Sequence, residues 1–409
     1  MTSDAAHPSQ PPSIIRTDAE VIVAGGGPVG LCVALLLAER QIPVTVVEAE
    51  AAIVRDLRAS TFHPPTLDML DGLGVAKPLI AQGLIAPRFQ YRSKRDGLIA
   101  QFDFTAIADA TAHPFRLQCE QSRLTRIVLQ RLRAAKNFEI VFSSPVRGVT
   151  QTADAVAVTV TRDGHAETET GRWLIGADGA RSETRSALDI AFEGFTWPER
   201  FLVVSTPFDF HAVIQDLVCV NYVADPRRWH FLLQIPGVWR VMFPIAADES
   251  DALALSPDFA QSLMAQVVPG VSRYAIAHTT LYRVHQRVAT TFRKGRAFLI
   301  GDAAHINNPL GGMGMNGGIH DAINLTERLA AVWHGTQPET ELDRFDRQRR
   351  LVTKEYVEKQ SIQNKKNLEM PGTEFTDRLR HIAADKERTR AYLLAVSMLS
   401  SLKRAQELG

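Results

Sequence analysis

The 409-residue chain contains only three cysteines, Cys32, Cys119 and Cys219, and they lie far apart in the sequence. No CxxC pair occurs and no disulfide framework is indicated, so we expect a reducing compartment, the cytoplasm. An excess of charge of one sign is also missing, because 46 basic and 45 acidic residues leave a formal net charge of +1. This balance provides no electrostatic footprint for nucleic acid or for an anionic membrane.

Long apolar runs are absent as well. The longest candidate, residues 31–38, is far shorter than the roughly 20 residues of a transmembrane helix, and no signal-peptide pattern opens the chain. Residues 1–18 are rich in Pro, Ser and small residues without periodicity, which predicts a disordered leader. With 45% hydrophobic and 22% charged residues, the chain can bury a large core, and its length favours two interleaved domains. We expect no membrane and no nucleic-acid partner.

A compact βαβ unit is predicted near the N-terminus. Val21–Val23 and Val44–Val47 are short apolar strands, and Leu31–Arg40 is the helix between them. The turn at Gly25–Gly30 fits GxGxxG, in which glycines permit a tight turn, close approach of the backbone to a phosphate and close helix packing. The helix N-terminus then faces the pyrophosphate. Glu48, at the end of the second strand, is placed to bind ribose hydroxyls, so a nucleotide is predicted, although this turn alone fits an NAD dehydrogenase equally well.

Two further strands are followed by an aspartate and a glycine. Asp178-Gly179 comes after the apolar pair Leu174-Ile175, and Gly301-Asp302 comes after Ala297–Ile300. In open α/β sheets ligands bind at the carboxyl ends of the strands. Three convergent strand ends therefore indicate one extended cofactor, FAD, lying across the sheet.

The remaining segments predict other kinds of structure. Residues 138–173 alternate like a meander, with a hairpin turn at Arg162-Asp163-Gly164. Residues 201–244 predict three or four strands of a separate antiparallel sheet that covers the reaction site. The last residues, to Gly409, are charged and helical.

The motifs in this order resemble the single-component flavoprotein aromatic hydroxylases, the para-hydroxybenzoate hydroxylase family. The resemblance runs from about Val21 to Trp333 and rests on three motifs: the glycine turn, Asp178-Gly179 with Ser182 and Arg185, and Gly301-Asp302-Ala303-Ala304-His305 leading to Pro309 and Asn316. It implies an α/β fold in which an FAD-binding Rossmann-like βαβ domain is interleaved with an antiparallel-sheet substrate domain, followed by C-terminal helices. The expected division is a leader at 1–18, an FAD domain at 19–80, 100–190 and 280–335, a substrate domain at 81–99 and 191–279, and a helical region at 336–409.

The resemblance also implies the roles of cofactor-binding residues. Glu48 would hold the adenosine ribose, Asp302 the ribityl chain, Arg58 the pyrophosphate and Gln121 the middle of the cofactor. The segment 311–316 would wrap the isoalloxazine, with backbone amides at its end directed to the flavin O2. The expected set is Gly25, Gly27, Pro28, Val29, Gly30, Glu48, Arg58, Gln121, Asp178, Gly301, Asp302, Pro309, Gly312, Gly314, Met315 and Asn316.

The chemistry implied by the resemblance is hydroxylation of an aromatic ring without a metal. No second glycine fingerprint is present, so NAD(P)H is expected as a transient co-substrate. It would transfer a hydride to the flavin, which would react with O2 to a C4a-hydroperoxide and pass a hydroxyl group to a small phenolic or N-heteroaromatic substrate. Pro309, His63, Tyr222 and His230 are the candidates for the substrate pocket.

Alternative functions are weighed against the same residues. A flavin-dependent halogenase needs a WxWxIP segment, which Val238–Pro244 does not fit. A quinone-precursor hydroxylase of the ubiquinone-biosynthesis type would share most motifs, and a non-catalytic flavin redox sensor is the alternative from another class. Asn307-Asn308-Pro309 stands where many relatives carry Pro-Pro, which blurs the substrate class. A homodimer is one candidate assembly, and the sequence does not determine the oligomeric state.

Overall fold

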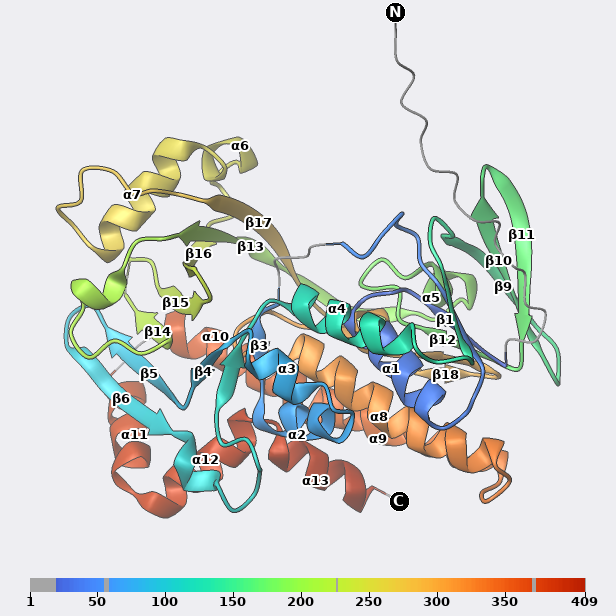
Figure 1. Ribbon diagram of the computed structural model, residues 1–409. Coiled ribbons are helices and arrows are strands. Elements are labelled where there is room, and N and C mark those ends of the chain that lie inside the picture. The colour runs from blue at the N-terminus through green and yellow to red at the C-terminus, as the bar shows by residue number, and fades with distance from the viewer. Residues whose placement is uncertain (1–19, 55–58, 226, 370–372, 409) are drawn as a thin grey trace, which may run out of the picture.

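The structure is a computed structural model that describes residues 20–54, 59–225, 227–369 and 373–408. The expected leader, 1–18, and the expected pyrophosphate ligand Arg58 lie outside these ranges. The described residues form four sheets with helices packed between and around them (Figure 1).

A six-stranded sheet forms the core of the nucleotide-binding half. Its order is β18-β19-β12-β1-β2-β8, parallel except for β18. All residues of β1, β2, β12 and β19 are buried, as expected for parallel strands covered on both faces. The four apolar strands read from the sequence are confirmed. The strands are β1 (Val21–Ala24), β2 (Val44–Val47), β8 (Phe138–Val141), β12 (Trp173–Gly176), β18 (Arg293–Lys294) and β19 (Ala297–Leu299).

Two long helices pack together beside this sheet. Helix α1 (Pro28–Glu39) starts three residues earlier than predicted, because a proline suits the first helical position. Helix α8 (Gly314–Trp333) packs against α1, and Gly318 allows the close approach, since a Cβ there would lie 2.6 Å from Val29 Cγ2. The other helices of this half are α2 (Pro64–Gly72), α3 (Ala76–Ile80), α4 (Gln121–Leu132) and α5 (Glu183–Ala187).

The predicted meander is shorter than expected. Strand β8 does not belong to it but pairs in parallel with β2, because its alternating pattern also fits the edge of the parallel sheet. The meander consists of β9 (Val146–Gln151), β10 (Val156–Arg162) and β11 (His165–Gly171). Its predicted hairpin turn is confirmed, with φ of 47° at Asp163 and 80° at Gly164.

An eight-stranded sheet forms the second half of the molecule, in the order β20-β17-β13-β16-β15-β14-β5-β6. Helices α11 (Thr373–Ala384) and α12 (Lys386–Val396) contribute to the apolar cluster on one face, and α6 (Asp251–Ala254) and α7 (Pro257–Val267) to the cluster on the other. The expected boundaries at 99 and 279 fall inside strands of this sheet. Its strands are β5 (Arg88–Ser93), β6 (Gly97–Asp103), β13 (Phe192–Thr206), β14 (Val220–Ala224), β15 (His230–Ile235), β16 (Val238–Ile245), β17 (His278–Ala289) and β20 (His305–Ile306).

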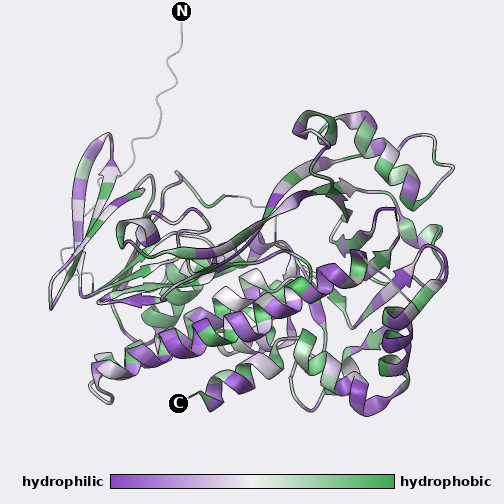
Figure 2. Cartoon of the chain, turned by 180° about the vertical axis from the view of Figure 1, so that it is seen from behind, coloured by the Kyte–Doolittle hydropathy of each residue, from purple (hydrophilic) through white to green (hydrophobic). Residues whose placement is uncertain are grey.

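The paired strands β13 and β17 run between the two halves (Figure 1). The C-terminal region is helical, as expected, with α9 (Leu342–Val352), α10 (Lys359–Glu369) and α13 (Leu399–Glu407) beside α11 and α12. The long helical run at the front of Figure 2 alternates hydrophilic and hydrophobic segments, as a helix with one buried face does. No helix in the described ranges is both long and apolar enough to cross a membrane.

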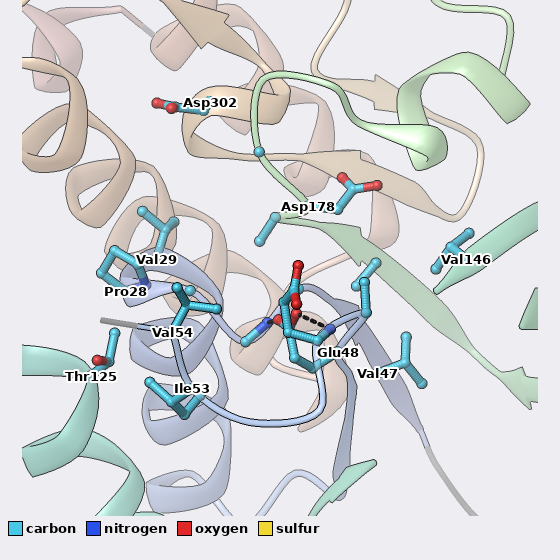
Figure 3. A pocket seen from close by; sticks show the side chains of 18 of the residues that line it. Pro28, Val29, Val47, Glu48, Ile53, Val54, Thr125, Val146, Asp178 and Asp302 are labelled. Carbon is cyan, nitrogen blue, oxygen red and sulfur yellow. Dashed lines mark hydrogen bonds between the residues drawn. The ribbon is translucent and has the colours of Figure 1, made fainter. Parts of the chain in front are cut away.

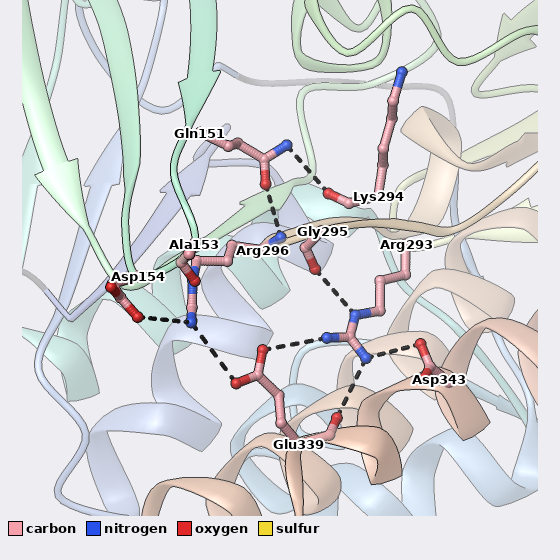
Figure 4. A network of polar contacts seen from close by, with 9 residues as sticks. All are labelled: Gln151, Ala153, Asp154, Arg293, Lys294, Gly295, Arg296, Glu339 and Asp343. Atoms are coloured by element: carbon pink, nitrogen blue, oxygen red, sulfur yellow. Dashed lines mark hydrogen bonds and ion pairs between the residues drawn. The ribbon is translucent and has the colours of Figure 1, made fainter.

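A polar network joins the meander, the parallel sheet and the C-terminal helices (Figure 4). The Arg293 guanidinium donates to Asp343 Oδ1 at 2.8 Å and pairs with Glu339 at 3.4 Å. The backbone N–H of Arg296 donates to Gln151 Oε1 at 2.7 Å. These contacts hold the turn between β18 and β19 in place, and β19 leads directly into the third predicted cofactor segment.

Candidate active site

A cavity of about 660 Å³ opens at the carboxyl ends of β1, β12 and β19. All three predicted cofactor segments contribute to its wall, and Figure 3 shows Glu48, Asp178 and Asp302 reaching it from different elements. The expected cofactor residues on the wall are Gly25, Gly27, Pro28, Val29, Glu48, Gln121, Asp178, Asp302 and Met315. The convergence of strand ends inferred from the sequence is therefore present in space.

The glycine turn has the geometry that a bound phosphate requires. Gly25 has a φ of +103°, and a Cβ there would lie 2.5 Å from the Ala177 carbonyl oxygen. A Cβ on Gly30 would lie 1.9 Å from the Gly25 carbonyl oxygen. Only glycine fits either position, so the start of α1 comes close to β1 and directs its N-terminal N–H groups at the cavity. This cradle fits the pyrophosphate of a dinucleotide.

Glu48 and Asp178 mark two walls of the cavity. The Glu48 carboxylate accepts hydrogen bonds from the backbone N–H groups of Gly26 and, at 2.8 Å, Glu50. The Asp178 carboxylate accepts from Ser182 Oγ at 2.5 Å and from the Thr184 N–H at 2.9 Å. Both carboxylates are thus held in fixed positions at strand ends. Glu48 is placed there to bind a ribose, and Asp178 holds the turn of the second cofactor segment together.

The third segment is tied to the start of α2 through the Asn316 side chain. Its Oδ1 accepts from the His63 N–H at 2.9 Å, and its Nδ2 donates to the carbonyls of Thr61 at 2.8 Å and Gly312 at 2.6 Å. The sequence suggested a backbone role for Asn316 but not this side-chain role. The structure therefore brings His63 together with the loop that is expected to wrap the isoalloxazine.

The other substrate-pocket candidates are not all brought together. Pro309 is exposed, and its carbonyl accepts from the Gly312 N–H at 3.0 Å. Tyr222 stacks on Tyr91, with ring centroids 5.0 Å apart. His230 packs against Phe243 in the cluster on the opposite face of the eight-stranded sheet, where burial lowers its pKa to about 4. Tyr222 and His230 therefore do not face one common pocket.

His63 is completely buried at the N-terminus of α2. Its Nε2 lies 2.7 Å from the Gly311 carbonyl oxygen, and because a carbonyl only accepts, Nε2 carries the hydrogen. Burial, followed by the nearby Arg116, holds the pKa of the imidazole well below its usual value, so the ring is neutral. Nδ1 is then a hydrogen-bond acceptor, and it has no partner among the described residues.

Arg116, in β7 (Arg116–Gln118), is a buried cation that the sequence reasoning missed. Its guanidinium lies 4.7 Å from the Phe89 ring centroid and 5.5 Å from that of Phe104. No hydrogen bond or ion pair from the described residues reaches it, although the residue is only 3% exposed. Ring contacts of this kind contribute roughly 2 kcal/mol, whereas removing an unpaired ion from water costs several kcal/mol. The alternation Arg-Leu-Gln was the available signal that Arg116 and Gln118 share a face.

A group of tyrosines lies near this arginine. The hydroxyl of Tyr392 donates to that of Tyr91 at 3.1 Å, and burial raises the pKa of Tyr392 to about 12. Arg116 influences the pKa of both hydroxyls, so the three side chains are close in space. No group of three or more metal-ligating side chains that could hold a metal ion occurs within the described part of the chain.

Comparisons with known proteins agree with this geometry. A family profile described as "FAD binding domain" matches residues 18–360. The para-nitrophenol 4-monooxygenase of Pseudomonas sp. (strain WBC-3) is 36% identical over 342 residues, covering 82% of this chain and 84% of the relative. The 6-hydroxy-3-succinoylpyridine 3-monooxygenase of Pseudomonas putida (strain DSM 28022 / S16) is 34% identical over 387 residues, covering 90% and 95%.

A solved structure shows the same architecture. The p-nitrophenol 4-monooxygenase of Pseudomonas putida DLL-E4 superposes with a TM-score of 0.88 at 30% identity, over 95% of this chain and 99% of that one. The expected fold class is thereby confirmed, as is FAD as the cofactor of the cradle. With its FAD cradle and relatives of nearly equal length, the chain belongs to the family of class A flavoprotein aromatic monooxygenases.

Proposed function

We propose that this monooxygenase hydroxylates a small, single-ring phenolic or N-heteroaromatic compound that carries a hydroxyl group. The observation that carries the proposal is the near-full-length similarity to two enzymes whose names specify such rings, a nitrophenol and a hydroxypyridine. Both relatives are matched over more than four fifths of this chain.

The residues of the site support separate roles in binding the different parts of FAD. The glycine turn and the N-terminus of α1 would hold the pyrophosphate, Glu48 the ribose, and Asp302 with Met315 the flavin half of FAD. Bound FAD would supply hydride acceptance from NAD(P)H and activation of O2. The buried face that carries His63 and Arg116 lies beside the loop expected around the flavin ring. A ring bound there would be screened from water, which hydroxyl transfer requires.

Product formation tests this proposal directly. The FAD-loaded enzyme is incubated with NADH or NADPH, O2 and a panel of substituted phenols and hydroxypyridines, and hydroxylated products are quantified together with NAD(P)H consumption. We expect at least one single-ring compound to yield product in a ratio close to one per NAD(P)H. Binding of FAD without product from any aromatic would favour the redox-sensor alternative. Product only from long-chain quinone precursors would favour the ubiquinone-type alternative.

Two further proposals concern localisation and assembly. We propose a cytoplasmic protein, from the cysteine content, and a homodimer. Fractionation of cells and sedimentation of the purified enzyme test these two expectations independently of activity.

A further inference from the structure

The small sheet β3-β7-β4 lies next to the loop at residues 311–316, and on one of its faces polar side chains of β3 and β7 stand beside Leu84 and Ala86 of β4. Its strands are β3 (Thr61–Phe62), β7 (Arg116–Gln118) and β4 (Leu84–Ala86). Phe62 and Leu117 belong to the core cluster of the nucleotide-binding half. Because side chains alternate along a strand, Thr61, Arg116 and Gln118 point to the opposite side. The hydrogen bond from Thr61 Oγ1 to Gln118 Oε1, 2.8 Å long, confirms that these two share a face.

Three buried nitrogen atoms on or beside this face have no hydrogen-bond partner among the described residues. They are His63 Nδ1, Arg116 Nε and Gln118 Nε2. The three residues are 0%, 3% and 0% exposed. Buried polar groups are nearly always hydrogen-bonded in folded proteins, so a concentration of unpartnered groups at one place indicates that a ligand completes them.

The chemistry of Arg116 and His63 restricts the chemical class of the ligand. Arg116 is a cation with no acidic partner among the described residues, so it requires an anionic oxygen. His63 Nδ1 is an acceptor, because Nε2 carries the hydrogen, so it requires a donor. A carboxylate satisfies Arg116 but brings no hydrogen to Nδ1, and a ring without substituents satisfies neither. A ring hydroxyl satisfies both when its proton passes to Nδ1 and its oxygen becomes anionic.

We propose that His63 and Arg116 bind the ring hydroxyl of the substrate and convert it to the phenolate form. The O–H bond breaks, its electron pair stays on the oxygen, the proton moves to His63 Nδ1, and the Arg116 guanidinium holds the resulting anion. The Gln118 amide, on the same face, donates a further hydrogen bond. This assignment rests on the proposed function and deepens it, because an electron-rich phenolate accepts an electrophilic oxygen more readily than a phenol does.

The surroundings of His63 keep its ring neutral, so Nδ1 carries no proton before the substrate binds. Arg116 from β7 and His320 from α8 are the charged and titratable groups that act on it, and both disfavour its protonated form. The Gly311 carbonyl holds Nε2 and so keeps the acceptor nitrogen free for the substrate. Once the phenolate forms between the two side chains, its negative charge offsets the repulsion between imidazolium and guanidinium.

The probe for the test is 4-nitrophenol, because its anion absorbs visible light and its neutral form does not. Difference spectra of the FAD-loaded enzyme, with and without the probe and without NAD(P)H, report the ionised fraction of bound probe as a function of pH. We expect the bound probe to ionise at least one pH unit below the free probe. In Arg116→Gln this shift should disappear and affinity for the anion fall at least tenfold, while Arg116→Lys keeps most of the shift.

His63→Asn is the second variant. Asparagine is a good residue for a helix N-terminus, so folding and FAD binding, checked by flavin absorbance and circular dichroism, should persist. Below the solution pKa of the probe this variant should bind the neutral form and produce no anion. The control ligand is 4-nitroanisole, which has no ionisable hydroxyl, and its affinity should change less than threefold in all variants.

Several outcomes would overturn the assignment. They are an unchanged ionisation curve in Arg116→Gln, anion formation in His63→Asn equal to that of the unmodified enzyme, or a loss of affinity that is larger for 4-nitrobenzoate than for 4-nitrophenol. The last result would make Arg116 a carboxylate site. Failure of the proposed function is a separate observation, since it shows as absence of product in turnover while the probe still ionises on binding.

Discussion

The Arg185 guanidinium donates a hydrogen bond of 2.8 Å to the carbonyl oxygen of Ala303 and thereby joins the second cofactor segment to the third. The same side chain donates to the Ala180 carbonyl at 3.0 Å and lies 3.9 Å from the centroid of the Phe192 ring. One buried arginine thus sets the spacing between two strand ends that are far apart in sequence. The three cofactor segments depend on each other through such contacts as well as through the cavity they share.

Replacement of Arg185 by methionine should weaken FAD binding. A buried hydrogen bond from a charged group contributes about 1.5–3 kcal/mol, so a loss of affinity of about 10- to 100-fold is expected if the loop shifts. Arg185→Lys retains a charge but cannot reach both carbonyls in the same way. Its affinity for FAD should therefore lie between that of the unmodified protein and that of Arg185→Met. Fluorescence titration of the apoprotein with FAD measures both. Equal affinities in all three proteins would show that the loop keeps its position without this contact.

Two glycines of the first turn allow a matched comparison. In Gly30→Ala the new Cβ would lie 1.9 Å from the Gly25 carbonyl oxygen, so both the fold of the turn and FAD binding should be lost. In Gly27→Ala no atom of a described residue other than its chain neighbours lies within 4 Å of the new Cβ, and φ is −71°. The second variant should therefore melt like the unmodified apoprotein but bind FAD less tightly, because the methyl group stands where the phosphates approach. Thermal unfolding and FAD titration separate the two effects, and FAD binding by Gly30→Ala at normal affinity would contradict the prediction.

Much of the nucleotide-binding half was readable from the sequence for a physical reason. A parallel strand buried on both faces needs a continuous apolar run, and a phosphate turn needs glycines, so Val21–Ala24 and Gly25–Gly30 were recognisable locally. Strand β8 shows the limit, because the same short alternating pattern fits a meander or the edge of a parallel sheet. Its actual neighbour, β2, is set by tertiary pairing.

The substrate side was much less readable. Tyr222 and His230 both looked suitable for one pocket, but in the register of β14 and β15 Val223 faces His230 across the pair and Tyr222 faces Phe231. Adjacent strands in that register place the two candidates on opposite faces. Arg116 was missed for a related reason: its significance is that no acidic side chain in the described part of the chain pairs with it, which no local pattern reveals.

Asp321 on α8 is the centre of a buried network that should be essential for stability. It is 0% exposed and accepts from the Gly301 N–H at 3.0 Å, from His305 Nε2 at 2.7 Å and from Arg349 Nε at 2.6 Å. In Asp321→Asn the Arg349 charge stays buried without its partner, which should cost about 3–5 kcal/mol. Chemical denaturation measures the loss.

Two controls define the origin of that loss. The double variant Asp321→Asn with Arg349→Met should be less destabilised than the sum of the single variants, because the unpaired charge is removed. Glu355→Gln, which breaks the exposed ion pair with Arg404, should cost at most about 1 kcal/mol. A similar cost for Glu355→Gln and Asp321→Asn would show that burial of the charge is not the cause.

His320 provides a prediction on pH dependence. The side chain is buried, its Nε2 lies 2.9 Å from Thr66 Oγ1, and burial followed by the Arg349 charge lowers its pKa from 6.5 to about 3. Between these two pKa values the unfolded chain binds a proton at His320 that the folded protein does not. The free energy of unfolding therefore falls as the pH drops below about 6.5, by up to about 1.4 kcal/mol per pH unit from this group.

In His320→Gln the slope of the free energy of unfolding against pH should decrease by up to about 1.4 kcal/mol per pH unit, which corresponds to one proton. Thr66→Val loses the same hydrogen bond but keeps the imidazole, so its slope should match that of the unmodified protein. Urea unfolding at several pH values from 4 to 6.5 measures the slopes, and an unchanged slope in His320→Gln would mean that His320 is protonated in the folded protein.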